Sequence, residues 1–155
     1  MELSSDYREL LNVLKKYKVR YLVVGAYAVI YYTEPRYTKD IDIWVKPDIK
    51  NAVRLYNALK EFGAPLRGIR VEDFTNPNLI YQIGVEPVRV DIIMSLPGVS
   101  FDTAWKRRKK VMYGDIQINL LSIEDLIKVK KKLRRPNDIL DIEKLKKVAK
   151  LKLKK

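Results

Sequence analysis

The chain has 155 residues, of which 47% are hydrophobic, and this length and apolar content fit one domain with one core. It contains neither cysteine nor histidine. Disulfide frameworks, thiolate or imidazole metal sites, and Ser-His-Asp or Cys-His catalysis are therefore excluded. Any chemistry must use carboxylates, Lys, Arg, Tyr and the backbone, which favours reactions that depend on hard metal ions.

The formal net charge of +13 is unevenly distributed along the chain. Residues 106–155 carry 18 basic and 6 acidic side chains, against 14 and 13 in residues 1–105. The lysine-rich surface of a heat-adapted protein explains only part of this excess, because acidic residues do not rise with it. The asymmetry predicts a nucleic acid or another polyanion as partner of the basic C-terminal third.

Apolar periodicity and punctuation by Gly and Pro define the first half of the chain. In chain order they predict a helix over 6–17, a strand over 20–24, a helix over 26–32, a strand over 40–46 and a helix over 47–62. Residues 64–78 are expected to form a loop with a short helix near 71–74. The longest apolar run, residues 21–32, is too short to span a bilayer, so we expect a soluble cytoplasmic protein without a membrane partner.

The second half alternates in the same way. It predicts strands over 79–83 and 87–94, a helix over 100–109, a hairpin of strands 111–113 and 116–120, a helix from 122 that Pro136 stops, and a helix capped by Asp138 that runs to 149. This order indicates an α/β (α+β) domain over residues 1–155, in which helices flank a small mixed β-sheet. Its basic helical segment begins near residue 122.

Asp40 and Asp42 stand two residues apart in an apolar run. If the run is a strand, they share one face, with Cα atoms about 6.5 Å apart, and Ile41 and Ile43 share the other. Paired carboxylates suit Mg²⁺ or Mn²⁺, which prefer oxygen ligands. Alternatively, Asp40 caps the strand and Asp42 pairs with a surface Lys.

Two further positions extend this candidate site. Gly25 ends an apolar strand and opens a helix, where backbone N–H groups bind anions and the missing side chain allows close approach. Asp91 lies in an alternating run, and a strand next to residues 40–45 would bring it beside the aspartate pair. Three carboxylates from two strands make a site for two divalent ions. The alternative for Asp91 is a surface pair with Arg89 or Lys39.

These residues resemble the signature of the polymerase-β-like nucleotidyltransferase superfamily: an apolar strand with Gly25-Ala26, a spacer, Asp40-x-Asp42 and a third acid at Asp91. Several short segments make the resemblance more specific, because they are similar to small stand-alone nucleotidyltransferases related to AbiE-type toxins. These segments are Arg36-x-Thr38-Lys39, Gly98-Val99-Ser100-Phe101, Leu121-Ser122-x-Glu124-Asp125, Lys130, and Arg135-Pro136-x-Asp138-x-x-Asp141.

The resemblance implies a nucleotidyltransferase-like fold and the transfer of an NMP group from an NTP, such as ATP, to an acceptor hydroxyl of a nucleic acid such as tRNA, or of a protein. It implies that Asp40, Asp42 and Asp91 hold Mg²⁺ or Mn²⁺, expected as two ions, and form the catalytic set. It also implies a nucleotide-binding set, which comprises Gly25, Ala26, Arg36, Thr38, Lys39, Lys130 and Arg135. Asp138 and Asp141 match the family too, or else they cap a helix and pair with Lys130 or Arg135.

Ala26 departs from the Gly or Ser that is usual at this position of the family. The loss of a Ser hydroxyl removes one phosphate donor, although the backbone N–H stays. A catalytically inactive module that binds nucleotide or RNA is therefore the alternative function. A further alternative is one half of a toxin–antitoxin pair, with an antitoxin-like protein as partner.

Overall fold

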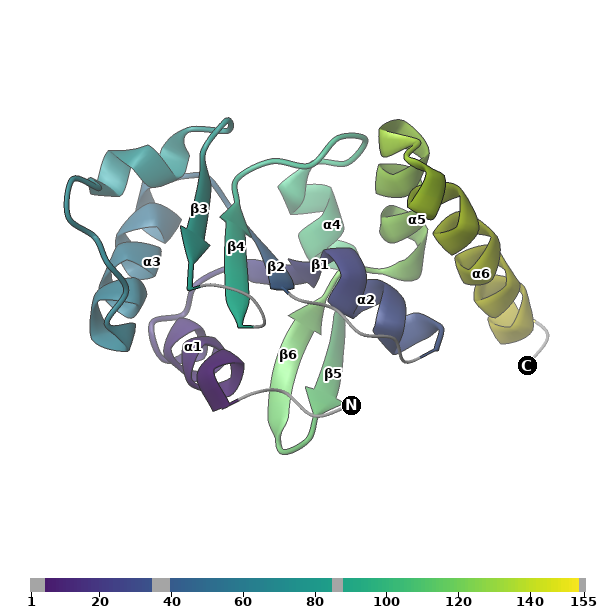
Figure 1. Ribbon diagram of the computed structural model, residues 1–155, viewed down its shortest axis with the longest axis horizontal. Helices are drawn as coiled ribbons and strands as arrows, with labels where there is room; N and C mark the ends of the chain where they lie inside the picture. Colours follow the sequence, from purple (N-terminus) through teal and green to yellow (C-terminus); the bar gives the residue numbers. More distant parts are fainter. Residues whose placement is uncertain (1–4, 35–39, 85–87, 154–155) are drawn as a thin grey trace.

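The computed structural model describes residues 5–34, 40–84 and 88–153. A six-stranded mixed sheet forms its centre, and helices flank it (Figure 1). The predicted α/β class, a small mixed sheet flanked by helices, is confirmed. Arg36, Thr38 and Lys39, which the sequence placed in the nucleotide-binding set, lie outside the described residues.

The strand order is β3-β4-β2-β1-β6-β5. The strands are β1 (Tyr21–Val24), β2 (Asp40–Val45), β3 (Ile80–Ile83), β4 (Arg89–Ile93), β5 (Lys109–Tyr113) and β6 (Ile116–Leu120). β2 runs parallel to β4 and β1 runs parallel to β6, whereas the other neighbours are antiparallel. The sheet is therefore mixed, as the alternation of helices and strands predicts.

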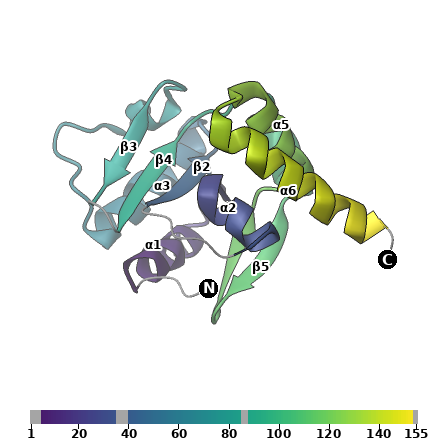
Figure 2. The same cartoon turned by 45° about the vertical axis from the view of Figure 1, so that its right-hand side comes forward.

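The helices are α1 (Ser5–Lys16), α2 (Gly25–Tyr32), α3 (Ile49–Phe62), α4 (Phe101–Arg107), α5 (Ile123–Leu133) and α6 (Pro136–Leu153), with a 3₁₀ turn η1 (Val71–Thr75). Figure 1 shows α1 and α3 together on one flank, and α5 and α6 on the other. After a turn of the view, α6 crosses in front of α5 and beside α2 (Figure 2). The helical pair α5–α6 therefore lies against the short helix that follows β1.

Alternation along β2 separates the core from the candidate site. Ile41, Ile43 and Val45 are fully buried, whereas Asp40 and Asp42 are only partly buried on the opposite face. Aliphatic side chains buried in this way each contribute about 1.5–3 kcal/mol relative to exposure. A shift by one residue would bury both aspartates in the core, so the apolar set fixes which face carries the carboxylates.

Several expected boundaries shift in the structure, and the shifts at Lys109 and at Pro136 are the ones that bear on the site. Lys109 belongs to β5 rather than to the preceding helix, which ends at Arg107. α5 ends at Leu133, before Pro136 as expected, and Pro136 itself begins α6, where the first turn needs no N–H donor from it. Asp138 accordingly lies in the first turn of α6 and accepts a hydrogen bond from the Arg135 N–H at 3.0 Å.

No helix in the described ranges is long and apolar enough to cross a membrane.

Candidate active site

The pairing of β2 with β4 brings three carboxylates together. In the parallel register Asp42 lies opposite Asp91, and Asp40 lies opposite Arg89. One oxygen from each of Asp40, Asp42 and Asp91 lies within 4.8 Å of the others. The predicted neighbourhood of the two strands thus exists, and the three side chains form one acidic cluster at the sheet surface.

The cluster is electrostatically strained. Burial raises the pKa of Asp42 to about 7, and the negative charges of Asp40 and Asp91 add to this effect. Burial likewise raises the pKa of Asp91, although the guanidinium of Arg89 opposes the shift. A cation at this point would relieve the repulsion between the carboxylates.

Arg89 supplies part of that positive charge. Its Nη2 donates to Asp40 Oδ2 at 2.9 Å and to Asp91 Oδ2 at 3.1 Å. The pair of Arg89 with Asp91, considered from the sequence as the alternative to a metal site, therefore exists alongside the acidic cluster. Tyr7 on α1 donates its hydroxyl hydrogen to the Arg89 carbonyl at 3.0 Å and so fixes the start of β4.

The residues of the cluster fit divalent metal ions. All three side chains are hard oxygen donors, and Asp91 Oδ1 is buried without a hydrogen-bond partner. Ligand oxygens around one octahedral Mg²⁺ lie about 3–4 Å apart, so small carboxylate rotations would bring this set into one coordination shell. A buried oxygen without a hydrogen-bond partner is costly, and a bound metal ion would satisfy it.

Gly25 lies against the cluster because β1 pairs with β2 and places Val24 opposite Asp42. Its φ is +67°, and a Cβ at this position would overlap Asp42 Oδ2. Glycine is therefore required both for the left-handed backbone and for the close approach. As the first residue of the eight-residue helix α2, Gly25 leaves backbone N–H groups at a positive helix end beside the carboxylates.

A cavity of about 360 Å³ connects Asp42 with the basic residues of the α5–α6 pair. Its lining includes Gly25, Ala26, Asp42, Lys130, Arg135, Asn137, Asp138 and Asp141. Four of the predicted nucleotide-binding positions, on α2 and on the α5–α6 pair, thus converge on one space with a predicted metal ligand. Its polar rim and helix N-terminus suit a phosphate chain.

Lys130 and Arg135 differ in how they are held. Lys130 is 6% exposed, and its Nζ lies 3.1 Å from both Asp138 Oδ1 and Asp141 Oδ2. The Arg135 side chain is 66% exposed, and its Nε lies 2.8 Å from Asp138 Oδ2. The ion pairs of Asp138 and Asp141, considered as an alternative to a family role, are therefore present. The positive charge of Arg135 partly opposes the rise in the pKa of Asp42, so the Arg135 guanidinium acts on the acidic cluster.

A second cavity of about 270 Å³ adjoins the first at Asp42 and reaches Asp91. Its walls are mostly aliphatic and come from β3, β4 and α5, with Ile80, Ile93, Leu96, Leu126, Val129 and Leu133 among them. No local sequence pattern predicts this space, since its walls come from separate elements. The cluster therefore stands between a polar cavity and an apolar one, as expected for a site that binds a ligand with both kinds of surface.

Comparison with known proteins agrees with this geometry. Residues 3–155 match the model of a family described as nucleotidyl transferases of unknown function (DUF2204). Among curated proteins, none matches the chain.

Two solved structures share the fold. One is a lincosamide antibiotic adenylyltransferase in a lincomycin-bound crystal structure, with a TM-score of 0.60 and 17% identity over 95% of this chain and 98% of that one. The other is a putative nucleotidyltransferase from Thermotoga maritima, with a TM-score of 0.55 and 16% identity over 96% of this chain and 91% of that one. At such low identity the likeness concerns the fold.

Proposed function

The chain belongs to the family of nucleotidyl transferases of unknown function, and from that premise we propose that it transfers an NMP group from an NTP to an acceptor hydroxyl in a metal-dependent reaction. The observation that carries the proposal is the cluster of Asp40, Asp42 and Asp91, in which Asp42 lines both cavities and Asp91 lines the apolar one. The resemblance to polymerase-β-like nucleotidyltransferases is confirmed at the level of the family. A relation to AbiE-type toxins stays a prediction.

Asp40, Asp42 and Asp91 would hold two Mg²⁺ or Mn²⁺ ions. Ions bound there would neutralise the phosphate oxygens and stabilise an in-line displacement at the α-phosphorus. The acceptor oxygen forms a bond to the α-phosphorus, the bond to the β-phosphate oxygen breaks, and pyrophosphate leaves with the electron pair. By analogy with the polymerase-β-like superfamily, Asp91 would be the carboxylate that helps to remove the proton from the acceptor hydroxyl.

The polar cavity would hold the triphosphate. Backbone N–H groups at Gly25 and Ala26 donate to phosphate oxygens, and the α2 dipole favours the negative charge. Arg135 contributes an exposed guanidinium at the opposite wall. Lys130 contributes mainly by holding Asp138 and Asp141, which offset its own charge.

One specific residue favours a second function, that of a nucleotide- or RNA-binding module without catalysis. Ala26 has no hydroxyl with which to bind a phosphate at the start of α2. Metal titration separates the two functions. An enzyme should bind Mn²⁺ together with a nucleotide and lose both on Asp40→Asn, whereas a binding module should not need metal.

The decisive experiment incubates the protein with Mg²⁺ and each labelled NTP in turn, in the presence of total RNA, cell extract or a panel of hydroxylated small molecules. We expect label to move to one acceptor and pyrophosphate to appear in equal amount. Asp42→Asn should abolish both products, whereas Asp115→Asn on the β5–β6 turn should keep them. Transfer that survives Asp42→Asn, or no transfer in any combination, would refute the enzymatic proposal.

A further inference from the structure

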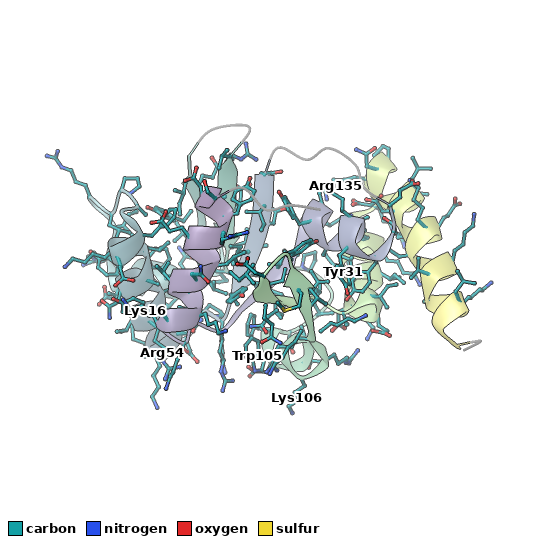
Figure 3. All side chains as sticks on the ribbon, turned by 90° about the horizontal axis from the view of Figure 1, so that it is seen from below. Lys16, Tyr31, Arg54, Trp105, Lys106 and Arg135 are labelled. Carbon is teal, nitrogen blue, oxygen red and sulfur yellow. The ribbon has the colours of Figure 1, made fainter. Side chains whose placement is uncertain are left out.

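A basic groove lies away from the candidate active site. Its cations, Lys15, Lys18, Arg20, Arg54, Arg108 and Lys110, line a cavity of about 390 Å³ at the start of β1, with no Asp or Glu among the lining residues. Gly25 follows the other end of the same strand. In Figure 3, Arg54 and Trp105 lie along the lower edge of the view, whereas Arg135, which lines the polar cavity, lies nearer the upper edge. The basic groove shares no lining residue with either cavity at Asp42, so it is a separate surface.

The cations of the basic groove differ from neighbouring cations in forming no close ion pair, although Arg20 interacts with Asp102 at longer range. Within the described ranges, none of the six forms an ion pair. Nearby cations do, as in Lys16 with Glu61, Lys46 with Asp102 and Arg107 with Asp125. A lysine-rich surface that serves only solubility would mix both signs. Uncompensated charge in a hollow therefore indicates an anionic ligand.

Arg108 is fixed in place before any ligand binds. Its guanidinium carbon lies 3.9 Å from the centroid of the Trp105 ring, and its Nη1 donates to the Trp105 carbonyl at 2.8 Å. Phe101 stacks on the same indole, with centroids 5.8 Å apart and planes 20° apart. The Arg108 Nε is itself buried, so the guanidinium N–H groups that are not buried are the donors that would meet a phosphate oxygen.

Polar side chains of the β5–β6 hairpin complete the wall of the groove. Lys110 and Asn119 are cross-strand neighbours. Gln117 precedes Asn119 by two residues and lies on the same face of β6. These amides can both donate to and accept from sugar hydroxyls and base edges. The groove thus combines phosphate-binding cations with groups that suit the other parts of a nucleotide chain.

We propose that the basic groove binds the sugar-phosphate backbone of single-stranded RNA. The six cations come from α1, the segment between α1 and β1, α3, the residue that follows α4, and β5, so the hollow gathers more positive charge than one phosphate group would neutralise. A chain of successive phosphates matches six cations better than a single small anion does. The inference goes beyond the proposed function and does not depend on it.

The test measures fluorescence anisotropy of a labelled RNA strand of about 20 nucleotides with the full chain, in EDTA and without NTP, over a range of salt concentrations. The variant Lys15→Glu/Arg54→Glu/Lys110→Glu changes three exposed side chains. We expect its affinity to fall at least roughly 30-fold and the slope of log K against log salt to flatten by about 2, because each lost contact to a single strand contributes about 0.7.

The matched control is Lys146→Glu/Lys147→Glu/Lys150→Glu on α6, which changes net charge equally and lies in the basic C-terminal third. It should leave the dissociation constant nearly unchanged, and so should Asp42→Asn. Equal losses in both triple variants, no loss in the groove variant, or displacement of the RNA by an equimolar amount of ATP would each overturn the proposal. If the groove triple variant does not fold by circular dichroism, Arg54→Gln/Lys110→Gln gives the same test with a smaller expected effect.

Discussion

Asp42 is a residue whose environment opposes its own charge. It is largely enclosed, it faces two other carboxylates, and its pKa is raised to about 7. Such a group destabilises the metal-free protein but provides a binding site for a cation. Groups of this kind are common at functional sites, where the lost stability is offset elsewhere in the fold. The same arrangement therefore links the stability of the protein to divalent ions.

We expect Asp42→Asn to raise the free energy of unfolding of the metal-free protein at pH 8 by about 1–2 kcal/mol, because it removes a buried like charge. Mg²⁺ or Mn²⁺ should raise the melting temperature of the wild type but not of this variant. Chemical denaturation and thermal shifts with and without EDTA measure both effects. Asp115→Asn is the control, and a variant that metal still stabilises equally would contradict the assignment.

Gly25 offers a second residue-scale prediction with a matched control. Gly25→Ala introduces a Cβ that overlaps Asp42 Oδ2, whereas Gly114→Ala has a similar φ of +60° but no atom nearer than 3.8 Å. Both substitutions should cost about 1–2 kcal/mol of stability through backbone strain. Only Gly25→Ala should also abolish nucleotide transfer and metal-dependent stabilisation, because it displaces a carboxylate.

At the scale of elements, the α5–α6 pair is held by a buried cation. Lys130 on α5 contacts Asp138 and Asp141 on α6, and all three side chains are less than a tenth exposed. Burial alone raises the pKa of Asp138, but hydrogen bonds from Arg135 and Lys130 outweigh it and lower the pKa to about 2. This network positions Arg135 at the polar cavity, so it supports the site as well as the fold.

Asp138→Asn should destabilise the protein by about 3 kcal/mol at pH 7, because it leaves Lys130 with less compensation. The sign of the pH effect follows from the lowered pKa. The stabilisation is present above about pH 4, where Asp138 is ionised even in the unfolded chain, and is lost as the pH falls toward 2. The difference in unfolding free energy between wild type and variant, measured by denaturant titration at several pH values, should therefore shrink from pH 5 to pH 2 by about 2 kcal/mol. A pH-independent difference would contradict this.

Local pattern was sufficient for the elements that the site needs. Alternation in β2 predicted the shared face of Asp40 and Asp42, and odd-even parity on β4 limited Asp91 to the same side as Arg89. The start of the last helix was predicted too late, at a cap on Asp138, because proline fits equally well after one helix and in the first turn of the next. Which of these occurs depends on the left-handed turn at Arg134, whose φ is 51°.

Local sequence patterns could not predict contacts between segments that are distant in the chain. Tyr7 reaches Arg89 across 82 residues, and no local pattern marks it. The basic groove draws Lys15, Lys18 and Arg20 from the part of the chain where basic and acidic counts nearly balance, so charge counting directed attention to the C-terminal third instead. Whether a cation is paired depends on its neighbours in space, and sequence spacing does not give these.

At the scale of the whole molecule, positive charge is the dominant electrostatic feature. The chain carries +13, and six cations that form no ion pair with the acidic residues that the structure describes share one groove. Cations within about 10 Å repel one another noticeably at low ionic strength and much less when salt screens them. The buried pairs of Lys130 are screened far less, so salt should act mainly through the basic groove and the exposed lysines.

We therefore expect the melting temperature of the wild type to rise by a few degrees when NaCl increases from about 0.05 to 0.5 M.

The neutralised variant Lys15→Gln/Arg54→Gln/Lys110→Gln should melt higher than the wild type at low salt, because repulsion in the basic groove is reduced. The two proteins should converge at high salt, where screening has already removed that repulsion. Differential scanning fluorimetry across the salt range measures this, with Lys146→Gln/Lys147→Gln/Lys150→Gln as a control for dispersed charge. A groove variant that melts lower than the wild type at low salt would show that these cations stabilise the fold, and their lack of acidic partners would then need a structural reason rather than an anionic ligand.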